Sequence, residues 1–147
     1  PFTVYGPYGR PDMLILKMLS KIKNKKKLNV FNYGKHLRDF TYVEDVVNII
    51  FKLSKIKNKS IEIFNICASQ PIEINYLLKI SKKILNKNIK INLRPERKGE
   101  MKITYGSNKK LLKKISYKNF IQIEKGLKKT INWYNSFSNK KILDKFK

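Results

Sequence analysis

The chain is poor in the residues that disulfides, metal sites and nucleophilic triads require. Its 147 residues include one cysteine and one histidine. A single cysteine excludes an internal disulfide, and Cys67, which follows an apolar run, is interpreted as a buried structural thiol. His36, alone in a predicted turn, argues against a Ser-His-Asp triad and against a multi-histidine metal site. We therefore expect His36 to be a solvated turn residue, and we expect no metal.

Long apolar runs and a dinucleotide-binding loop are lacking as well. No apolar stretch approaches the roughly 18 residues that cross a bilayer. The residues after Pro1 do not have the pattern of a secretory signal, so a cytoplasmic location and no membrane partner are expected. The only Gly-x-x-Gly runs from Gly6 to Gly9, with no third glycine and no βα unit behind it. The sequence therefore contains no dinucleotide phosphate loop.

Acidic residues are also scarce, since 10 of them stand against 34 basic residues and give a formal net charge of +24. The lysines are spread over every segment rather than gathered on one face, and a genomic preference for the codons of Lys, Ile and Asn accounts for them. Weak attraction to polyanions at low salt follows from the charge alone. We expect no specific nucleic-acid partner, but a noncatalytic basic polyanion-binding fragment remains an alternative.

Arginine is rare, and each arginine is therefore informative. The four are Arg10, Arg38, Arg94 and Arg97. A planar guanidinium can bind a carboxylate or a phosphate with two parallel hydrogen bonds, which lysine cannot do. One interpretation is a set of anchors around one anionic ligand. The other is a set of surface ion pairs with Asp12, Asp39, Glu96 and Glu100, and the residues alone leave both open.

Apolar periodicity predicts short strands that alternate with helices. Strands are expected at 2–5, 28–31, 38–42, 61–66 and 90–93, with 28–42 as a hairpin and 61–66 buried. Five helices are expected. The first follows Asp12, which is its predicted N-cap, the second begins near Val43, the third follows Pro71, and the last two lie at 108–114 and 121–137. This predicts an α/β fold in which residues 1–147 form one lobe. The start at Pro1, inside a predicted strand, indicates a fragment of a larger protein.

Two segments carry a more specific pattern, FTVYGPYGRPDM at residues 2–13 and GKHLRDFTYVEDV at residues 34–46. The first resembles a segment of bacterial UDP-glucuronate 4-epimerases. The second resembles the G-x-x-x-R-D-F-[TV]-[YH]-[VI]-x-D-[VI] segment of the extended short-chain dehydrogenase/reductases, the NAD-dependent nucleotide-sugar epimerases and dehydratases. Matches at 64–66, 95–100 and 124–134 follow in the order of that family.

The resemblance implies that this chain is the C-terminal substrate-binding lobe of such an enzyme, without the N-terminal Rossmann part. Thr3 and Arg10 match positions that hold a C6 carboxylate of the sugar. Arg38 and Arg97 match the pair that binds the diphosphate, and Glu100 matches the acidic residue of the same loop. Two arginine forks suit a diphosphate because they neutralise and orient a dianion.

Further positions follow from the same resemblance. Asn29 and Phe31 match strand positions that meet the uracil, and Tyr5-Gly6-Pro7 matches the loop that closes over the nicotinamide end of NAD. The family's catalytic Ser/Thr and Tyr-x-x-x-Lys precede that loop, so no catalytic residue is expected in this chain, and NAD would be bound mainly by the N-terminal part. Tyr105 and Lys109 have the spacing of the Tyr-x-x-x-Lys motif, but they come long after the Tyr5-Gly6-Pro7 loop in the sequence. We therefore do not interpret them as catalytic residues.

Departures from the family pattern are few. Tyr8 stands where Trp is frequent, Cys67 where Gly is frequent and Glu100 where Asp is usual, which leaves the role of Glu100 the least defined. We interpret the chain as the nucleotide-sugar-binding part of a UDP-glucuronate 4-epimerase of polysaccharide biosynthesis. That isomerase oxidises C4, rotates the keto sugar and reduces it again. A UDP-sugar dehydratase or decarboxylase is the alternative within the family. The expected partners are a UDP-sugar, the N-terminal Rossmann part and a second copy in a homodimer, and the chain alone is predicted to be inactive.

Overall fold

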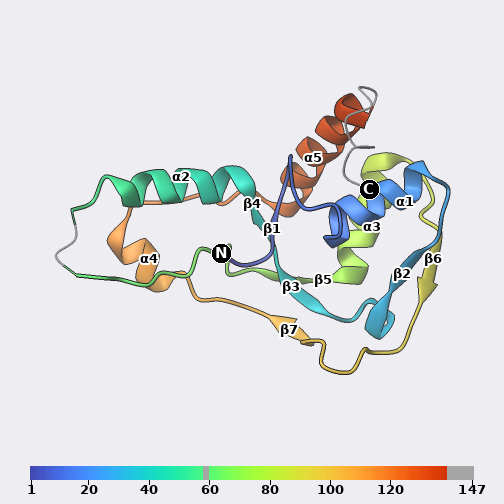
Figure 1. The fold of residues 1–147 in the computed structure, drawn as a ribbon, viewed down its shortest axis with the longest axis horizontal. Helices are drawn as coiled ribbons and strands as arrows, with labels where there is room; N and C mark the ends of the chain where they lie inside the picture. Colours follow the sequence, from blue (N-terminus) through green and yellow to red (C-terminus); the bar gives the residue numbers. More distant parts are fainter. Residues whose placement is uncertain (58–59, 139–147) are drawn as a thin grey trace.

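The computed structural model describes residues 1–57 and 60–138, and these form an α/β arrangement as the sequence predicts (Figure 1). Its strands are short, two or three residues each, and they pair in three small sheets. β1 (Val4–Tyr5) runs parallel to β4 (Thr41–Tyr42), and β2 (Leu28–Val30) runs parallel to β6 (Ile91–Leu93). The third sheet is central to the site because it contains β3 (Leu37–Asp39).

β3 lies between two strands that come from distant parts of the sequence. It pairs antiparallel with β5 (Pro71–Glu73) and parallel with β7 (Ile103–Thr104). A strand with neighbours on both edges has its backbone hydrogen bonds satisfied on both sides and is held firmly in place. The residues of β3 are therefore a rigid support for side chains that face a ligand.

Five α-helices and one short 3-10 helix complete the described residues. They are α1 (Leu14–Lys23), η1 (Phe31–Gly34), α2 (Val43–Ser54), α3 (Ile74–Leu85), α4 (Lys109–Lys114) and α5 (Ile123–Ser138). The predicted helices are confirmed to within a few residues, because each carries apolar side chains at helical spacing. None of these helices is both long and apolar enough to span a bilayer, as far as the described residues go.

Apolar side chains gather in two clusters at opposite ends of the molecule. The larger cluster is built mainly from α1, α3 and α5 together with the strands between them, and fully buried members include Met18, Leu28 and Leu77. The smaller cluster packs α2 against α4 and includes Ile49 and Leu111. Figure 1 shows α2 and α4 at one end and the β2/β6 pair at the other. The β1/β4 pair and β3 lie between these ends.

The predicted hairpin over residues 28–42 is wrong, because β2 and β3 belong to different sheets. Asn32 and Tyr33 take left-handed backbone conformations, with φ of 48° and 52°, and redirect the chain between the two strands. β2 instead pairs with β6, and the pairing continues past the strand through hydrogen bonds between Val30 and Arg94 and between Tyr33 and Arg94. The turn residues were recognisable from the sequence, but the distant partner strand was not.

The predicted buried strand at 61–66 is also wrong. This segment forms no strand in the described part of the chain, and Ile61 and Ile63 are 98% and 81% exposed. Its end is held by one backbone hydrogen bond, donated by the Phe2 amide to the Ile66 carbonyl at 2.9 Å. The apolar face predicted for α2 is only partly buried, because Val47 and Ile50 face outward.

The N-cap predicted for the first helix is wrong as well. Met13 occupies the cap position of α1 without any side-chain hydrogen bond, and Asp12 bonds Arg10 instead. A carboxylate beside an arginine gains two charge-assisted hydrogen bonds, which outweigh a single bond to a helix amide. Asp12 is therefore part of a surface ion pair at the start of α1.

Candidate functional site

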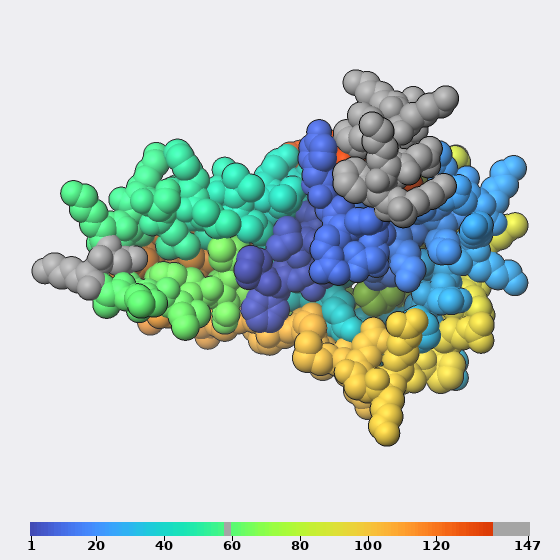
Figure 2. Space-filling view, in the orientation of Figure 1, coloured from blue at the N-terminus to red at the C-terminus, as the bar shows by residue number. Residues whose placement is uncertain are grey.

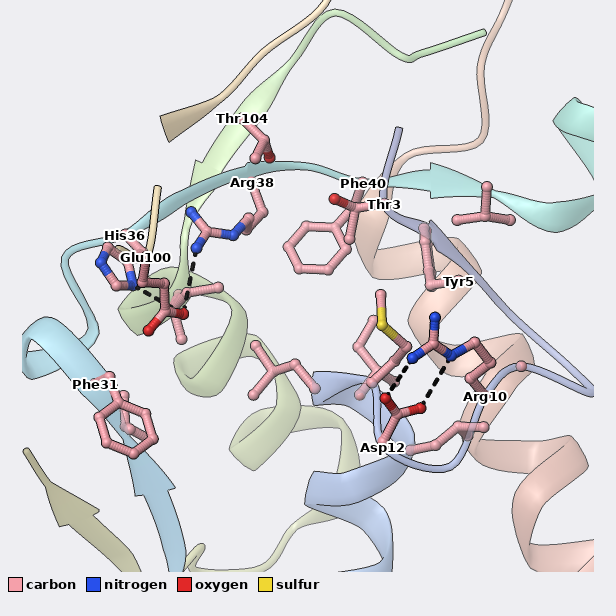
Figure 3. A pocket seen from close by; sticks show the side chains of 18 of the residues that line it. Thr3, Tyr5, Arg10, Asp12, Phe31, His36, Arg38, Phe40, Glu100 and Thr104 are labelled. Atoms are coloured by element: carbon pink, nitrogen blue, oxygen red, sulfur yellow. Dashed lines mark hydrogen bonds and ion pairs between the residues drawn. The ribbon is translucent and has the colours of Figure 1, made fainter. Parts of the chain in front are cut away.

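A pocket of about 320 Å³ lies between the N-terminal segment, β2 and β3. Figure 2 shows the corresponding recess between the dark blue N-terminal residues and the yellow-orange segment near residue 100. Most of its lining is apolar, but charged side chains stand at two ends (Figure 3). Arg10 and Asp12 form one end, and Arg38 and Glu100 form the other, with Phe40 between them. An elongated pocket of this kind suits a ligand with two separated anionic groups.

Arg38 is the most firmly held of the charged groups at the pocket. Its Nη1 donates hydrogen bonds to the carbonyls of Leu37 at 2.8 Å and Lys102 at 3.3 Å. Its Nη2 lies 3.5 Å from Oε1 of Glu100, and the side chain is only 16% exposed. The two carbonyls fix the guanidinium plane, so Arg38 is preorganised to receive an anion.

Arg38 does not pair with Asp39, although the ion-pair interpretation of the sequence joined them. Asp39 is fully buried and accepts hydrogen bonds from three backbone amides, those of Ser69, Gln70 and Gly106. Neighbouring residues on a strand point to opposite faces, so Arg38 and Asp39 cannot meet. Asp39 has a structural role, and Arg38 is left to the pocket.

His36 is buried, and the expectation of a solvated turn residue is wrong. It is 3% exposed, lines the pocket, and its Nδ1 lies 3.7 Å from Oε1 of Glu100. The missed signal is the spacing to Arg38, because residues two apart in an extended segment share one face. A histidine two residues ahead of a strand arginine faces the same pocket as that arginine.

At the other end of the pocket, Arg10 forms a two-pronged ion pair with Asp12. Its Nε donates to Oδ1 at 3.1 Å and its Nη2 to Oδ2 at 2.6 Å. Both side chains are mostly exposed, and the hydrogen bond from Arg10 holds the pKa of Asp12 below its usual range. This is the surface ion pair that the sequence left open as one alternative. Thr3 also lines the pocket, and Figure 3 shows it beside Phe40.

Phe31 and Asn29 are placed at the pocket by β2 and the start of η1. The side-chain amide of Asn29 lies 3.0 Å from that of Asn92 on β6. The guanidinium carbon of Arg97 lies 3.6 Å above the centre of the Phe31 ring, a cation–π arrangement. Arg97 is outside the pocket lining itself, and the Phe31 ring sets its position at the edge.

The Tyr5-Gly6-Pro7 loop is partly at the pocket. Tyr5 and Gly6 line it, whereas Pro7 does not. Gly6 has φ of +142°, and a Cβ there would lie 2.5 Å from Cγ1 of Val43, so this turn requires glycine. Tyr5 packs its ring edge-on against Tyr42, and burial raises the pKa of its hydroxyl, for which the described residues offer no hydrogen-bond partner.

Cys67 is confirmed as a buried free thiol. Burial raises its pKa, and its Sγ lies 3.5 Å from the Ser69 hydroxyl. Thr104 is a pocket residue that the sequence gave no reason to select, since nothing distinguishes it from other strand threonines. Its hydroxyl is buried without a partner in the described part of the chain. The described residues contain no group of three histidines, cysteines or acidic residues that could hold a metal ion.

Comparison with known proteins places this geometry in a family. A family model, "NAD dependent epimerase/dehydratase family", matches residues 1–67. A UDP-glucuronate 4-epimerase of Thermodesulfobacterium geofontis is 35% identical over 133 residues, which is 90% of this chain and 41% of that protein. The structure of UDP-glucuronic acid 4-epimerase from Bacillus cereus, in complex with UDP-glucuronic acid and NAD, superposes with a TM-score of 0.85 at 28% identity. The superposition covers 92% of this chain and 44% of the Bacillus cereus chain.

The chain belongs to the NAD-dependent epimerase/dehydratase family. It spans less than half the length of the relatives it matches, and the matched part of these epimerases and dehydratases is the C-terminal one. The family also contains dehydratases, since the NAD-dependent NDP-hexosamine 5,6-dehydratase TunA superposes with a TM-score of 0.81 at 26% identity, over 92% of this chain and 44% of TunA. The solved structures that this chain resembles therefore include both epimerases and a dehydratase, and the comparisons do not separate the two reactions.

Proposed function

We propose that this chain is the substrate-binding lobe of a UDP-glucuronate 4-epimerase and that its pocket holds the UDP-sugar. The observation that carries the proposal is a single pocket with one arginine at each end, Arg38 and Arg10. UDP-glucuronate has two anionic groups, a diphosphate and a C6 carboxylate, separated by the sugar ring. The order of charged and apolar groups along the pocket matches that of the ligand.

The diphosphate end consists of Arg38, Arg97 and Glu100. Arg38 is preorganised by two backbone carbonyls, and Arg97 is held over the Phe31 ring. Two guanidinium groups at the same end can neutralise a dianion and fix its orientation. Asn29 on β2 and Phe31 at the start of η1 would then contact the uracil, with the aromatic ring offering a flat apolar surface.

The carboxylate end consists of Arg10 and Thr3, and Asp12 occupies the Arg10 fork without ligand. A substrate carboxylate would replace one carboxylate by another of the same charge and geometry, so the exchange loses no hydrogen bonds. Asp12 is mostly exposed, and its charge returns to water when it is displaced. A neutral CH₂OH group cannot make this exchange, which is why the pair favours a uronic acid.

The residues around Tyr5 and Gly6 fit the edge of a cofactor site. A buried tyrosine hydroxyl without a partner in the described residues, next to a glycine turn that lines the pocket, offers a hydrogen-bonding atom and an aromatic surface. NAD, when bound, supplies hydride transfer at C4 of the sugar. The residues of this chain would orient the sugar beside it. Because the chain has no dinucleotide loop, we predict no turnover of UDP-glucuronate by the 147-residue chain with added NAD.

The diphosphate end is tested by titrating the chain with UDP and UMP. UDP should bind more tightly, and Arg38→Lys should weaken UDP by about 1.5–3 kcal/mol, roughly 10- to 150-fold, because a charge-assisted fork is lost. Arg94→Lys is the matched control, because Arg94 is an arginine of the same region of the sequence and does not line the pocket. Equal binding of UDP and UMP would contradict the proposal. Binding of nucleic acid that falls steeply with salt would then favour the polyanion alternative.

The carboxylate end is tested in the enzyme that contains this chain together with its N-terminal part. Arg10→Ala should lower kcat/KM for UDP-glucuronate by about 10- to 150-fold and leave any turnover of UDP-glucose nearly unchanged. Equal losses with both sugars would show that Arg10 acts on stability through Asp12, and would remove the glucuronate assignment. Product analysis separates the reaction types, since a dehydratase or decarboxylase releases water or carbon dioxide and an epimerase releases neither.

A further inference from the structure

His36, Glu100 and Arg38 form a continuous row of ionisable groups along one wall of the pocket (Figure 3). Oε1 of Glu100 lies 3.7 Å from Nδ1 of His36 and 3.5 Å from Nη2 of Arg38. One carboxylate oxygen therefore faces two nitrogen groups, and neither distance is that of a strong hydrogen bond. The charge of Glu100 is shared between them.

Two further atoms of this row are buried and lack a partner among the described residues, Nε2 of His36 and Oε2 of Glu100. A buried polar atom without a hydrogen bond is unfavourable, and such atoms in a native structure call for a reason. Glu100 can turn its carboxylate toward the imidazole without breaking a short hydrogen bond of its own. The row can thus exist in two arrangements, with Glu100 closer to Arg38 or closer to His36.

The other charged groups near the imidazole have partners of their own. Glu73 on β5 accepts a hydrogen bond from the Asn75 amide at 2.8 Å, and the Lys102 ammonium lies 3.6 Å from Glu96. The adjacent Lys35 is exposed. From α3, the backbone amide of Ile74 donates to the carbonyl of the histidine, not to its ring. Glu100 is thus the acidic side chain that contacts the ring, and Arg38 is the cation that competes for it.

We propose that His36 is a positioning residue that takes up a proton when the nucleotide diphosphate binds, acting through Glu100 on Arg38. The proposal rests on the proposed function. When a diphosphate binds Arg38, the positive charge of Arg38 no longer balances the negative charge of Glu100. The phosphate groups also bring further negative charge to this end of the pocket. A proton from solvent on the imidazole restores the balance, and Glu100 then pairs with His36. The Arg38 guanidinium is then free to bind the diphosphate, and Glu100 still has a partner of opposite charge in the protonated His36.

The direction of the pH dependence follows from this scheme. Because His36 binds its proton more tightly in the complex than in the free chain, the affinity for the nucleotide rises as the pH falls from 8 to 6. Each unit by which binding raises the titration midpoint of the imidazole corresponds to about tenfold in affinity. A histidine that only fills space would produce no such dependence.

His36 is the only histidine of the chain, so the Cε1 proton of its imidazole gives one NMR signal that needs no assignment among several histidines. With saturating UDP-glucose, Glu100→Gln should lower the titration midpoint of that signal relative to the wild type, because Glu100 then pairs with the imidazole and an opposite charge favours the imidazolium. Glu96→Gln is the matched control, an acidic residue of the same loop that pairs with Lys102. The midpoint should stay where it is in this variant. Equal midpoints for the wild type and Glu100→Gln would overturn the proposal.

The second arm measures binding of UDP-glucose, which has no group that titrates between pH 6 and 8. The wild-type chain should bind it several-fold more tightly at pH 6, and saturation should raise the imidazole midpoint. His36→Gln keeps a hydrogen-bond donor but cannot take up the proton, and should bind equally at both pH values. Equal wild-type affinity at both pH values overturns this inference alone. No binding at either pH, with an unchanged imidazole signal, overturns the proposed function and this inference together.

Discussion

The contact between Gly126 and Tyr5 joins the helix α5 to the wall of the pocket, and it can be tested without any ligand. Gly126 is buried in α5, and a Cβ at this position would lie 2.8 Å from Cζ of Tyr5 and 2.9 Å from Cδ2 of Tyr42, with the Tyr5 hydroxyl closer still. Both rings are themselves buried and cannot move aside freely. We therefore expect Gly126→Ala to be destabilising, although alanine is the better helix former.

The magnitude follows from two opposed effects. Replacing glycine by alanine inside a helix stabilises by about 0.5–1 kcal/mol. Forcing an extra methyl group into a packed core costs about 1–3 kcal/mol. The expected net loss is about 1–2 kcal/mol in the free energy of unfolding, or a decrease in Tm of roughly 2–8 °C for a chain of this size. Thermal unfolding followed by circular dichroism measures it.

Tyr5→Phe provides the matched second variant, because it removes the atom that the new methyl group would meet first. Alone, it should be neutral or slightly stabilising, since the hydroxyl is buried without a partner in the described residues. In the double variant it should restore about 1 kcal/mol. Lys128→Ala, at an exposed position of the same helix, should change the stability by no more than about 0.5 kcal/mol. A Gly126→Ala chain that is more stable than the wild type would refute the packing argument.

Three other outcomes follow from individual side chains, the first two from their burial. Cys67 is fully buried and its pKa is raised by burial, so alkylation by iodoacetamide should be slow in the folded chain and should reach the rate of a free thiol only in urea; rapid reaction under native conditions would contradict this. Burial, together with the hydrogen bond to Asp45, raises the pKa of Tyr117 to about 12, so its contribution to stability is complete below pH 10 and is lost as the pH rises toward 12. Tyr117→Phe should make the stability less dependent on pH in that range, as measured by urea unfolding. Phe31→Leu should weaken UDP binding by about 0.5–1 kcal/mol through the loss of the ring under Arg97, and should have a smaller effect when Arg97 is already alanine, because only the contact of the ring with the uracil is then lost.

Local periodicity was sufficient to predict the helices and the positions of several strands. The α3 helix, for example, follows directly from apolar residues at helical spacing after Pro71. The strand at Leu28 was located correctly, but its partner lies more than sixty residues away, at Ile91. Strand pairing over such a distance depends on which surfaces meet in three dimensions. The sequence of a single strand contains no information on its partner.

The segment at 61–66 shows the opposite failure. Its β-branched apolar residues predict burial, but burial requires a surface to cover them, and the described residues supply none for Ile61 and Ile63. The candidate site was suggested by the rarity of arginine, which singled out all four arginines, and the family resemblance then selected Arg10, Arg38 and Arg97. The same reasoning missed His36, because a lone histidine in a turn was judged without the face that it shares with Arg38.

The buried carboxylate of Asp39 has a consequence for the rate of folding. The amides that it binds lie 30, 31 and 67 residues further along the chain, on either side of α3. Closing a loop of twice the length costs only about 0.6 kcal/mol more, so these separations add little to the free energy of loop closure. Both segments, residues 69–70 and the one that contains Gly106, must nevertheless reach Asp39 before its carboxylate is satisfied, and contacts of such long range slow the search for the native state. We expect β3, and with it the Arg38 end of the pocket, to become ordered only late in folding, after helices such as α3 have formed.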